Sequence, residues 1–183
     1  MTRSGSAIRI VEASAADLAA ALEVERLAFG TDDVADLVRA LVDDPSAAPV
    51  LSLLAVDLDR AVGHIMFTAA HLREAGDDVT MSILAPLAVV PDAQQTGVGG
   101  RLIDRGVRRL GESGVGLVFV LGHPDYYSRH RFEPAGRLGL AAPYPVSPEE
   151  AWMVRALRPG LIGRVQGVVG CAEALDRPEH WRE

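Results

Sequence analysis

The chain has 183 residues, of which 49% are hydrophobic and 23% are charged. This composition excludes disordered and fibrous proteins and predicts one domain over residues 1–183, because a single core typically spans roughly 100–200 residues. The net charge of −7 is uneven, since residues 1–90 carry 14 acids and 6 arginines, whereas residues 91–183 carry 11 acids and 12 arginines. We therefore expect no nucleic-acid partner for the acidic first half, and the second half is better suited to phosphate-bearing ligands.

The chain contains a single cysteine, Cys171, and no lysine. One cysteine excludes an intrachain disulfide and a cysteine-based zinc site, and the apolar, glycine-rich surroundings of Cys171 favour a buried thiol. The absence of lysine excludes a complete Walker A loop and a Schiff base. The histidine spacing matches no metal motif, so we expect no metal site.

No apolar run in the sequence approaches the roughly 20 residues that a bilayer-spanning helix needs. Residues 1–6 are not followed by the apolar core of a secretory signal. The sequence therefore predicts a cytoplasmic protein with no membrane partner.

The first half of the chain combines helical and strand patterns. Alternating β-branched residues predict a strand at 8–12, and Ser14 with Asp17 forms a predicted capping box for a helix over 15–29. A second helix is predicted over 33–42. Three apolar runs separated by turns at 57–60 and 73–78 predict antiparallel strands over 50–56, 61–71 and 79–90.

The second half begins with an amphipathic helix over 97–110 and a buried strand over 116–121. Because a strand, a helix and a strand in succession form a crossover, the strands on either side of this helix should be parallel neighbours. Further strands are predicted over 152–157 and 165–171. The fold class is therefore α/β (α+β), with a mixed, mostly antiparallel sheet flanked by helices.

The strongest local feature is the apolar strand end 87–90, followed by a Pro-Asp turn, a glycine-rich loop and the start of a helix. The first backbone N–H groups of a helix lack internal partners and lie at the positive end of its dipole, so they bind anions. Glycines 97, 99 and 100 would let a pyrophosphate approach the backbone. A dinucleotide fingerprint is disfavoured, because it needs a glycine at the position of Leu102 and an acidic residue after the next strand.

The sequence Gln-X-X-Gly-X-Gly at 94–99, preceded by Leu-X-Val-X-Pro at 87–91, resembles the coenzyme-A-binding motif of the GNAT superfamily of N-acetyltransferases. The segment 122–135, with its Tyr-Tyr, Arg, Phe and Pro-Ala succession, is similar to the closing segment of that superfamily, in particular of the bacterial YhbS-like acetyltransferases. The motifs cover 87–135, and the order of elements agrees over essentially the whole chain.

The resemblance implies a GNAT-like sheet with one parallel strand pair around the coenzyme A site, and acetyl-CoA as co-substrate without a metal. It implies that Tyr127 reaches the cofactor sulfur as general acid toward the leaving thiolate, and Tyr126 is expected to be the packed member of the pair. One departure is Arg131, where the family usually has glycine, and this change predicts an altered turn after Tyr127. The implied cofactor-binding residues are Leu87, Ala88 and Val89 for the pantetheine and acetyl carbonyl, and Gln94, Gln95, Thr96, Gly97, Val98, Gly99 and Gly100 for the pyrophosphate.

The general base is less evident than the acid. Glu25 is the first candidate, because its helix would flank the acceptor cleft, and deprotonation of the amine in bulk water remains an alternative. The acceptor is expected to be a small-molecule amine or a peptide N-terminus, and a homodimer remains open. The rival hypothesis is a non-catalytic acyl-CoA-binding sensor or partner domain. Four other residues are open as bases: Glu23, His64, His71 and His123.

Overall fold

The computed structural model describes residues 7–74 and 78–182. Its centre is a mixed sheet with the strand order β1–β2–β3–β4–β5–β8–β6, and the short strands β7 and β9 pair with each other, with β9 also pairing with β3. The strands are β1 (Arg9–Glu12), β2 (Leu51–Asp57), β3 (Arg60–Leu72), β4 (Met81–Val89), β5 (Leu117–Leu121), β6 (Glu133–Pro134), β7 (Leu140–Ala141), β8 (Trp152–Ala156) and β9 (Gly167–Gly170).

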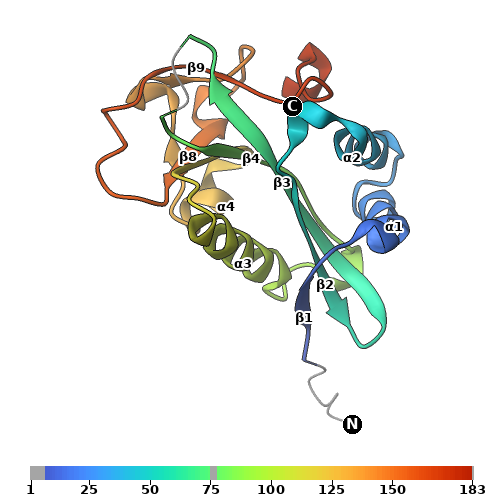
Figure 1. Cartoon of the computed structure of the whole chain (residues 1–183). Helices are drawn as coiled ribbons and strands as arrows, with labels where there is room; N and C mark the ends of the chain where they lie inside the picture. Colours follow the sequence, from blue (N-terminus) through green and yellow to red (C-terminus); the bar gives the residue numbers. More distant parts are fainter. Residues whose placement is uncertain (1–6, 75–77, 183) are drawn as a thin grey trace.

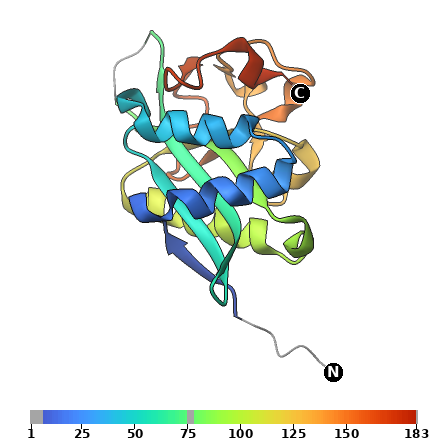
Figure 2. The ribbon, with the colours of Figure 1, turned by 90° about the vertical axis from the view of Figure 1, so that its right-hand side faces the viewer.

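Two helices cover one face of the sheet and one helix covers the other (Figures 1 and 2). α1 (Leu18–Phe29) and α2 (Asp33–Asp43) lie side by side on the first face, and α3 (Val98–Glu112) lies on the second. The short helix α4 (Pro124–Ser128) follows β5. Among the helices that the structure describes, none is long and apolar enough to cross a membrane.

The core has two parts because both faces of the sheet are covered. On the α2 side, Leu41, Met66 and Trp152 are among the buried residues, and on the α3 side Phe67 and Leu102 are. The apolar stripe predicted for the third helix is confirmed, since the buried residues of α3 are Val98, Leu102, Ile103, Gly106, Val107 and Leu110.

The parallel pair that the crossover predicts is β4 with β5, in register from Met81 opposite Leu117 to Leu84 opposite Val120. All the other strand pairs on the main path of the sheet are antiparallel. The ladder between β4 and β5 ends at Leu84, whereas β4 itself continues to Val89, still paired with β3. The two parallel strands therefore diverge in the middle of the sheet.

The predicted fold class, a mixed and mostly antiparallel sheet with flanking helices, is confirmed. The predicted ends of most elements agree with the structure within two residues, but the first helix begins with a 3-10 turn over Ala15–Asp17. The capping box is present, with the Ser14 backbone N–H donating to the Asp17 carboxylate at 2.7 Å. Residues 1–6, and 75–77 of the second predicted turn, lie outside the described residues.

The predicted burial of Cys171 is confirmed, since its residue is 8% exposed. Burial raises the pKa of the Cys171 thiol to about 12. The thiol is therefore protonated at neutral pH, and this favours a packing role over nucleophilic chemistry.

Candidate active site

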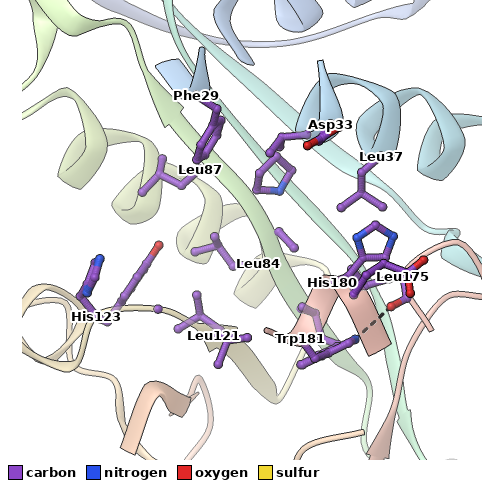
Figure 3. A pocket seen from close by; sticks show the side chains of 18 of the residues that line it. Phe29, Asp33, Leu37, Leu84, Leu87, Leu121, His123, Leu175, His180 and Trp181 are labelled. Atoms are coloured by element: carbon purple, nitrogen blue, oxygen red, sulfur yellow. Dashed lines mark hydrogen bonds between the residues drawn. The ribbon is translucent and has the colours of Figure 1, made fainter. Parts of the chain in front are cut away.

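A cavity of about 880 Å³ lies where β4 and β5 diverge. One wall comes from β4, from the end of β5 and from α4, and the opposite wall comes from the α1–α2 region and the C-terminal segment (Figure 3). The 3-10 turn η6 (Pro178–Trp181) belongs to that C-terminal segment. The cavity is lined by Phe29, Asp33, Val34, Asp36, Leu37, Ile83, Leu84, Ala85, Pro86, Leu87, Val120, Leu121, Gly122, His123, Tyr126, Tyr127, Leu175, Glu179, His180 and Trp181.

The walls of the cavity are mostly apolar, with the ionisable groups placed at two positions. In Figure 3, Asp33 and His180 lie on the side of α2 and η6, and His123 lies on the side of α4. Asp36 and Glu179 also line the cavity, so three carboxylates are present. This arrangement suits a ligand with an apolar body and a cationic group.

Tyr127 lies in this cavity wall and is held firmly in place. Its backbone N–H donates to the carbonyl of His123 at 3.1 Å, and its ring makes edge contacts with the rings of Tyr126 and Phe132, at centroid distances of 5.0 and 5.7 Å. The residue is 8% exposed. Burial, and secondarily the neighbouring Tyr126, raises the pKa of Tyr127 far above the ordinary value of 10.0. The hydroxyl is therefore protonated at neutral pH.

The expectation that Tyr126 is the packed member of the pair is wrong. Tyr127 is the buried ring, because α4 turns it inward against Phe132, whereas Tyr126 is half-buried. Tyr126 instead reaches α3, where its hydroxyl is so close to Gly99 that a Cβ there would lie 2.5 Å from Oη. A side chain at position 99 would therefore displace the Tyr126 ring, and Tyr126 joins the cavity to the start of α3.

The turn after Tyr127 is closed with Arg131 in a glycine-like conformation. Arg131 adopts φ +68°, the left-handed conformation that a glycine takes without strain. The backbone N–H of Phe132 then donates to the carbonyl of Tyr127 at 3.2 Å. Arg131 therefore takes the backbone conformation that a glycine would take in this turn, which removes one argument for the non-catalytic alternative.

The glycine-rich loop forms the start of α3 as predicted. Gly97 is the N-cap with φ +88°, and Gln95 also takes a left-handed conformation with φ +60°. Gln94 Nε2 donates to the carbonyl of Val89 at 3.0 Å, and the Thr96 hydroxyl donates to the carbonyl of Ala93. These two side chains therefore stabilise the loop itself. Of the remaining loop residues, Gln95 and Gly97 are exposed, Gly99 and Gly100 are half-buried, and only Val98 is buried. The first turn of α3 is therefore open to a ligand.

The segment Leu87–Val89 lies at the end of β4, beyond the point where β5 diverges. Its residues pair with β3 on one edge, Leu87 with Ile65 and Val89 with Gly63. Leu87 lines the cavity, whereas Ala88 is buried. The second edge of this segment faces the gap between β4 and β5, so an extended ligand chain can lie along it.

Glu25 is not among the residues that line the cavity, although its helix does flank the cavity through Phe29. The side chain is fully buried, and Oε1 lies 2.6 Å from Nδ1 of His64, which is also fully buried. His64 Nε2 lies 2.8 Å from the Ser52 hydroxyl. Burial raises the pKa of Glu25, and the hydrogen bond and charge of His64 partly oppose this. Helix α1 turns Glu25 toward the sheet one turn before Phe29, whose ring does line the cavity.

The other candidate bases are scattered over the fold. Glu23 is exposed on α1 and lies 3.9 Å from Arg26, and His71 lies at the end of β3 beside β9. His123 alone of the named alternatives lines the cavity. Within 7–74 and 78–182, no group of three or more His, Cys, Asp and Glu side chains is arranged to hold a metal ion.

Sequence reasoning missed the C-terminal wall of the cavity. This segment is anchored to the end of α2, since the backbone N–H of Ala174 donates to Asp44 at 2.9 Å and that of Glu173 donates to Ser46 at 2.8 Å. Trp181 packs on Trp152 with 5.4 Å between ring centroids. No local pattern could have revealed a wall whose two halves are about 130 residues apart in the chain.

The chain matches the acetyltransferase (GNAT) domain family over residues 9–135. The uncharacterized N-acetyltransferase YjhQ of Escherichia coli K12 is 54% identical over 139 residues, which cover 74% of this chain and 76% of that protein. The uncharacterized N-acetyltransferase YhbS of the same strain is 31% identical over 153 residues, covering 83% and 89%.

Solved structures agree with this match. The crystal structure of E. coli YhbS in complex with CoA has a TM-score of 0.87 and 29% identity, covering 97% of this chain and 96% of that one. A GNAT family acetyltransferase from Brucella melitensis, in complex with acetyl-CoA, has a TM-score of 0.75 and 26% identity, covering 93% and 99%. Since the matched family segment includes the diverging strands, the glycine-rich loop and Tyr127, the chain belongs to the GNAT family of N-acetyltransferases.

Proposed function

We propose that the protein transfers an acetyl group from acetyl-CoA to a primary amine by direct attack in the cavity between β4 and β5. The observation that carries this proposal is the junction at Tyr126, which lines the cavity and also contacts Gly99 at the start of α3. One ligand can therefore occupy both places, with its phosphates at the helix and its thioester in the cavity. The bound CoA and acetyl-CoA of the two related structures support the same donor.

The donor is held by backbone groups in this proposal. The pyrophosphate accepts hydrogen bonds from the open first turn of α3 and from the loop Gln94–Gly100, where the helix dipole also favours an anion. The pantetheine lies along the free edge of Leu87, Ala88 and Val89. A backbone N–H of this edge stabilises the charge that the thioester oxygen gains during attack.

Tyr127 is proposed as the general acid toward the leaving thiolate. A thiol has a pKa of about 8.5 and a free tyrosine of about 10, so full proton transfer is already uphill. Because burial raises the pKa of Tyr127 further, its main contribution is a hydrogen bond that tightens as the C–S bond breaks. The hydroxyl enters the reaction protonated and needs no activation.

The proton of the attacking amine has two proposed destinations. His123 on the cavity wall can accept it, or water in the open cavity can carry it away. Glu25 is proposed to act through position, since it fixes His64 and thereby α1 and the Phe29 wall. A direct role for Glu25 as base would require its buried carboxylate to reach the amine.

The proposed acceptor is a cationic primary amine with an apolar body, carried by a small molecule or by a peptide N-terminus. The carboxylates of Asp33, Asp36 and Glu179 attract the ammonium group, and the leucines and aromatic rings of the cavity bind the apolar part. We place this activity in the cytoplasm, with no membrane or nucleic-acid partner and with the chain acting alone or as a homodimer.

The test is a thiol-release assay with acetyl-CoA and a panel of amines, with the acetylated product identified by mass spectrometry. We expect thiol release that depends on the amine and product that is N-acetylated. Binding of acetyl-CoA without thiol release for any amine would support a non-catalytic acyl-CoA-binding domain. A protein that binds neither CoA nor acetyl-CoA would contradict both functions.

A further inference from the structure

A second cavity, of about 540 Å³, lies beside α3 and is lined by none of the residues of the acceptor cavity. Its walls bring together residues from α3, from the turn after α4 and from β8, which lie near one another in Figure 1. A smaller cavity of about 360 Å³ shares Arg108, Arg131 and Arg155 with it. The residues that line the larger one are Asp104, Val107, Arg108, Arg129, His130, Arg131 and Arg155, and we call this region the arginine groove.

The arginine groove holds four guanidinium groups against one carboxylate. In the part of the chain that the structure describes, none of the four arginines makes an ion pair within 4.0 Å. Burial, and secondarily the charge of Arg131, lowers the pKa of Arg155. Arg155 is half-buried and the other three arginines are exposed, so the groove offers guanidinium groups that water reaches and that no carboxylate of the described residues pairs within 4.0 Å.

The fold holds these charges together at a cost. The Arg155 guanidinium donates to the carbonyl of His130 at 3.1 Å, which fixes it under the turn after α4. Arg131 takes φ +68°, a left-handed conformation that is unfavourable for a side chain with a Cβ. Arg131 therefore combines a strained backbone with a place in a cluster of like charges, and binding of an anion would stabilise that cluster.

We propose that the arginine groove binds a phosphate monoester. The planar guanidinium group donates two parallel hydrogen bonds to a phosphate, so several arginines around one cavity match this dianion in both charge and geometry. Asp104, which lies four residues before Arg108 on α3, also lines the groove and limits its net positive charge without neutralising it.

Two sources of this phosphate are consistent with the position of the groove. His130 connects the groove to the start of α3, because a Cβ at Gly100 would lie 3.0 Å from His130 Cε1. From Gly100 to Arg108 the helix rises by about 12 Å. The phosphate can therefore be the 3′-phosphate of a coenzyme A bound at the same helix, which rests on the proposed function, or it can belong to a separate phosphorylated molecule.

The first arm of the test compares CoA with 3′-dephospho-CoA by isothermal titration. The variants are Arg131→Gly, which suits the left-handed backbone, and Arg155→Met, with Arg39→Gln on α2 as the charge-matched control. If the 3′-phosphate is the ligand, the unsubstituted protein binds CoA roughly tenfold or more tightly than 3′-dephospho-CoA. Each groove variant then loses roughly tenfold in affinity for CoA and keeps its affinity for 3′-dephospho-CoA. Arg39→Gln should keep the preference.

The second arm needs no coenzyme and measures thermal unfolding in inorganic phosphate and in chloride at equal ionic strength. If the ligand is a separate phosphorylated molecule, phosphate raises the Tm of the unsubstituted protein and of Arg39→Gln but not of the groove variants. CoA and 3′-dephospho-CoA then bind equally. Equal binding of the two coenzymes, together with no phosphate-specific Tm shift, would overturn the proposal. A protein that binds no coenzyme would refute the proposed function, while this second arm would still decide on the groove.

Discussion

Oε1 of Glu25 lies 2.6 Å from Nδ1 of His64, and both side chains are fully buried. The contact joins α1 to β3, and the Ser52 hydroxyl of β2 occupies the other ring nitrogen at 2.8 Å. In a medium of low dielectric such a pair is strongly interdependent, because loss of one partner leaves the other without its hydrogen bond. The pair therefore fastens the helix that carries Phe29 to the centre of the sheet.

Glu25→Ala should lower the free energy of unfolding by about 3 kcal/mol, because it leaves His64 buried without its partner. Urea denaturation followed by circular dichroism measures the change. The matched control is Glu23→Ala, an exposed position on the same helix, which should change the stability by less than about 0.5 kcal/mol. Equal effects of the two substitutions would show that the buried contact contributes nothing.

The same contact predicts a pH dependence of stability. Because burial raises the pKa of Glu25 above its ordinary value of 4.5, the folded state favours the protonated carboxyl. This contribution to stability is complete below the unfolded pKa and is lost as the pH rises through the folded pKa. Glu25→Gln cannot titrate, so the unsubstituted protein should lose stability relative to Glu25→Gln as the pH is raised above about 4.5. Urea denaturation of both proteins over a pH series measures this, and parallel curves would refute it.

Tyr127→Phe should lower the turnover number and leave the KM for acetyl-CoA nearly unchanged. The loss should not exceed the effect of a positioned acid, which is typically about 100- to 10,000-fold. The control is Tyr144→Phe, which removes a hydroxyl that donates to the Asp176 carbonyl outside the cavity lining and should retain the turnover number. Steady-state kinetics with the best amine of the panel measures both. An unchanged turnover number for Tyr127→Phe would remove this residue from the mechanism.

Much of the fold could be predicted because its signals are local. The helix start at Gly97 and the amphipathic pattern behind it are contained in one short segment, and the alternation of strand and turn residues reveals the antiparallel strands. The parallel pairing of β4 with β5 follows from the crossover alone. The helix α4 was missed because five residues are too few for a helical period to appear.

The active site could be predicted only in part, for the same reason. The loop Gln94–Gly100 and Tyr127 belong to contiguous motifs, and these identify the donor side. Glu25 and His64 are 39 residues apart, so the sequence presented them as separate candidate bases and could not show that they bury each other. The acceptor wall depends on contacts between α2 and the residues after 172, which only the folded chain brings together.

Arg131→Gly should raise the free energy of unfolding by about 1 kcal/mol, because it relieves a left-handed conformation and removes a charge that repels Arg155. The matched control is Arg129→Gly two residues earlier, which removes a charge from the same groove but has φ −65°, so it relieves no left-handed conformation and adds freedom to the unfolded chain. That variant should be destabilised by about 0.5–1 kcal/mol. The same sign of change in both variants, measured by urea denaturation, would contradict the strain at Arg131.

Asp36→Asn should raise the KM for cationic amines by up to about fivefold with little change in kcat, because an exposed carboxylate attracts an ammonium group only weakly through water. The effect should shrink as salt is added, since the interaction is screened over about 10 Å at moderate ionic strength. Glu112→Gln, at the end of α3 on the other face of the sheet, removes the same charge without touching the cavity. Steady-state kinetics of both variants at two salt concentrations measures these effects. An equal rise of KM in both variants would mean that the overall charge of the protein attracts the amine. An unchanged KM in Asp36→Asn would mean that the acceptor binds away from α2.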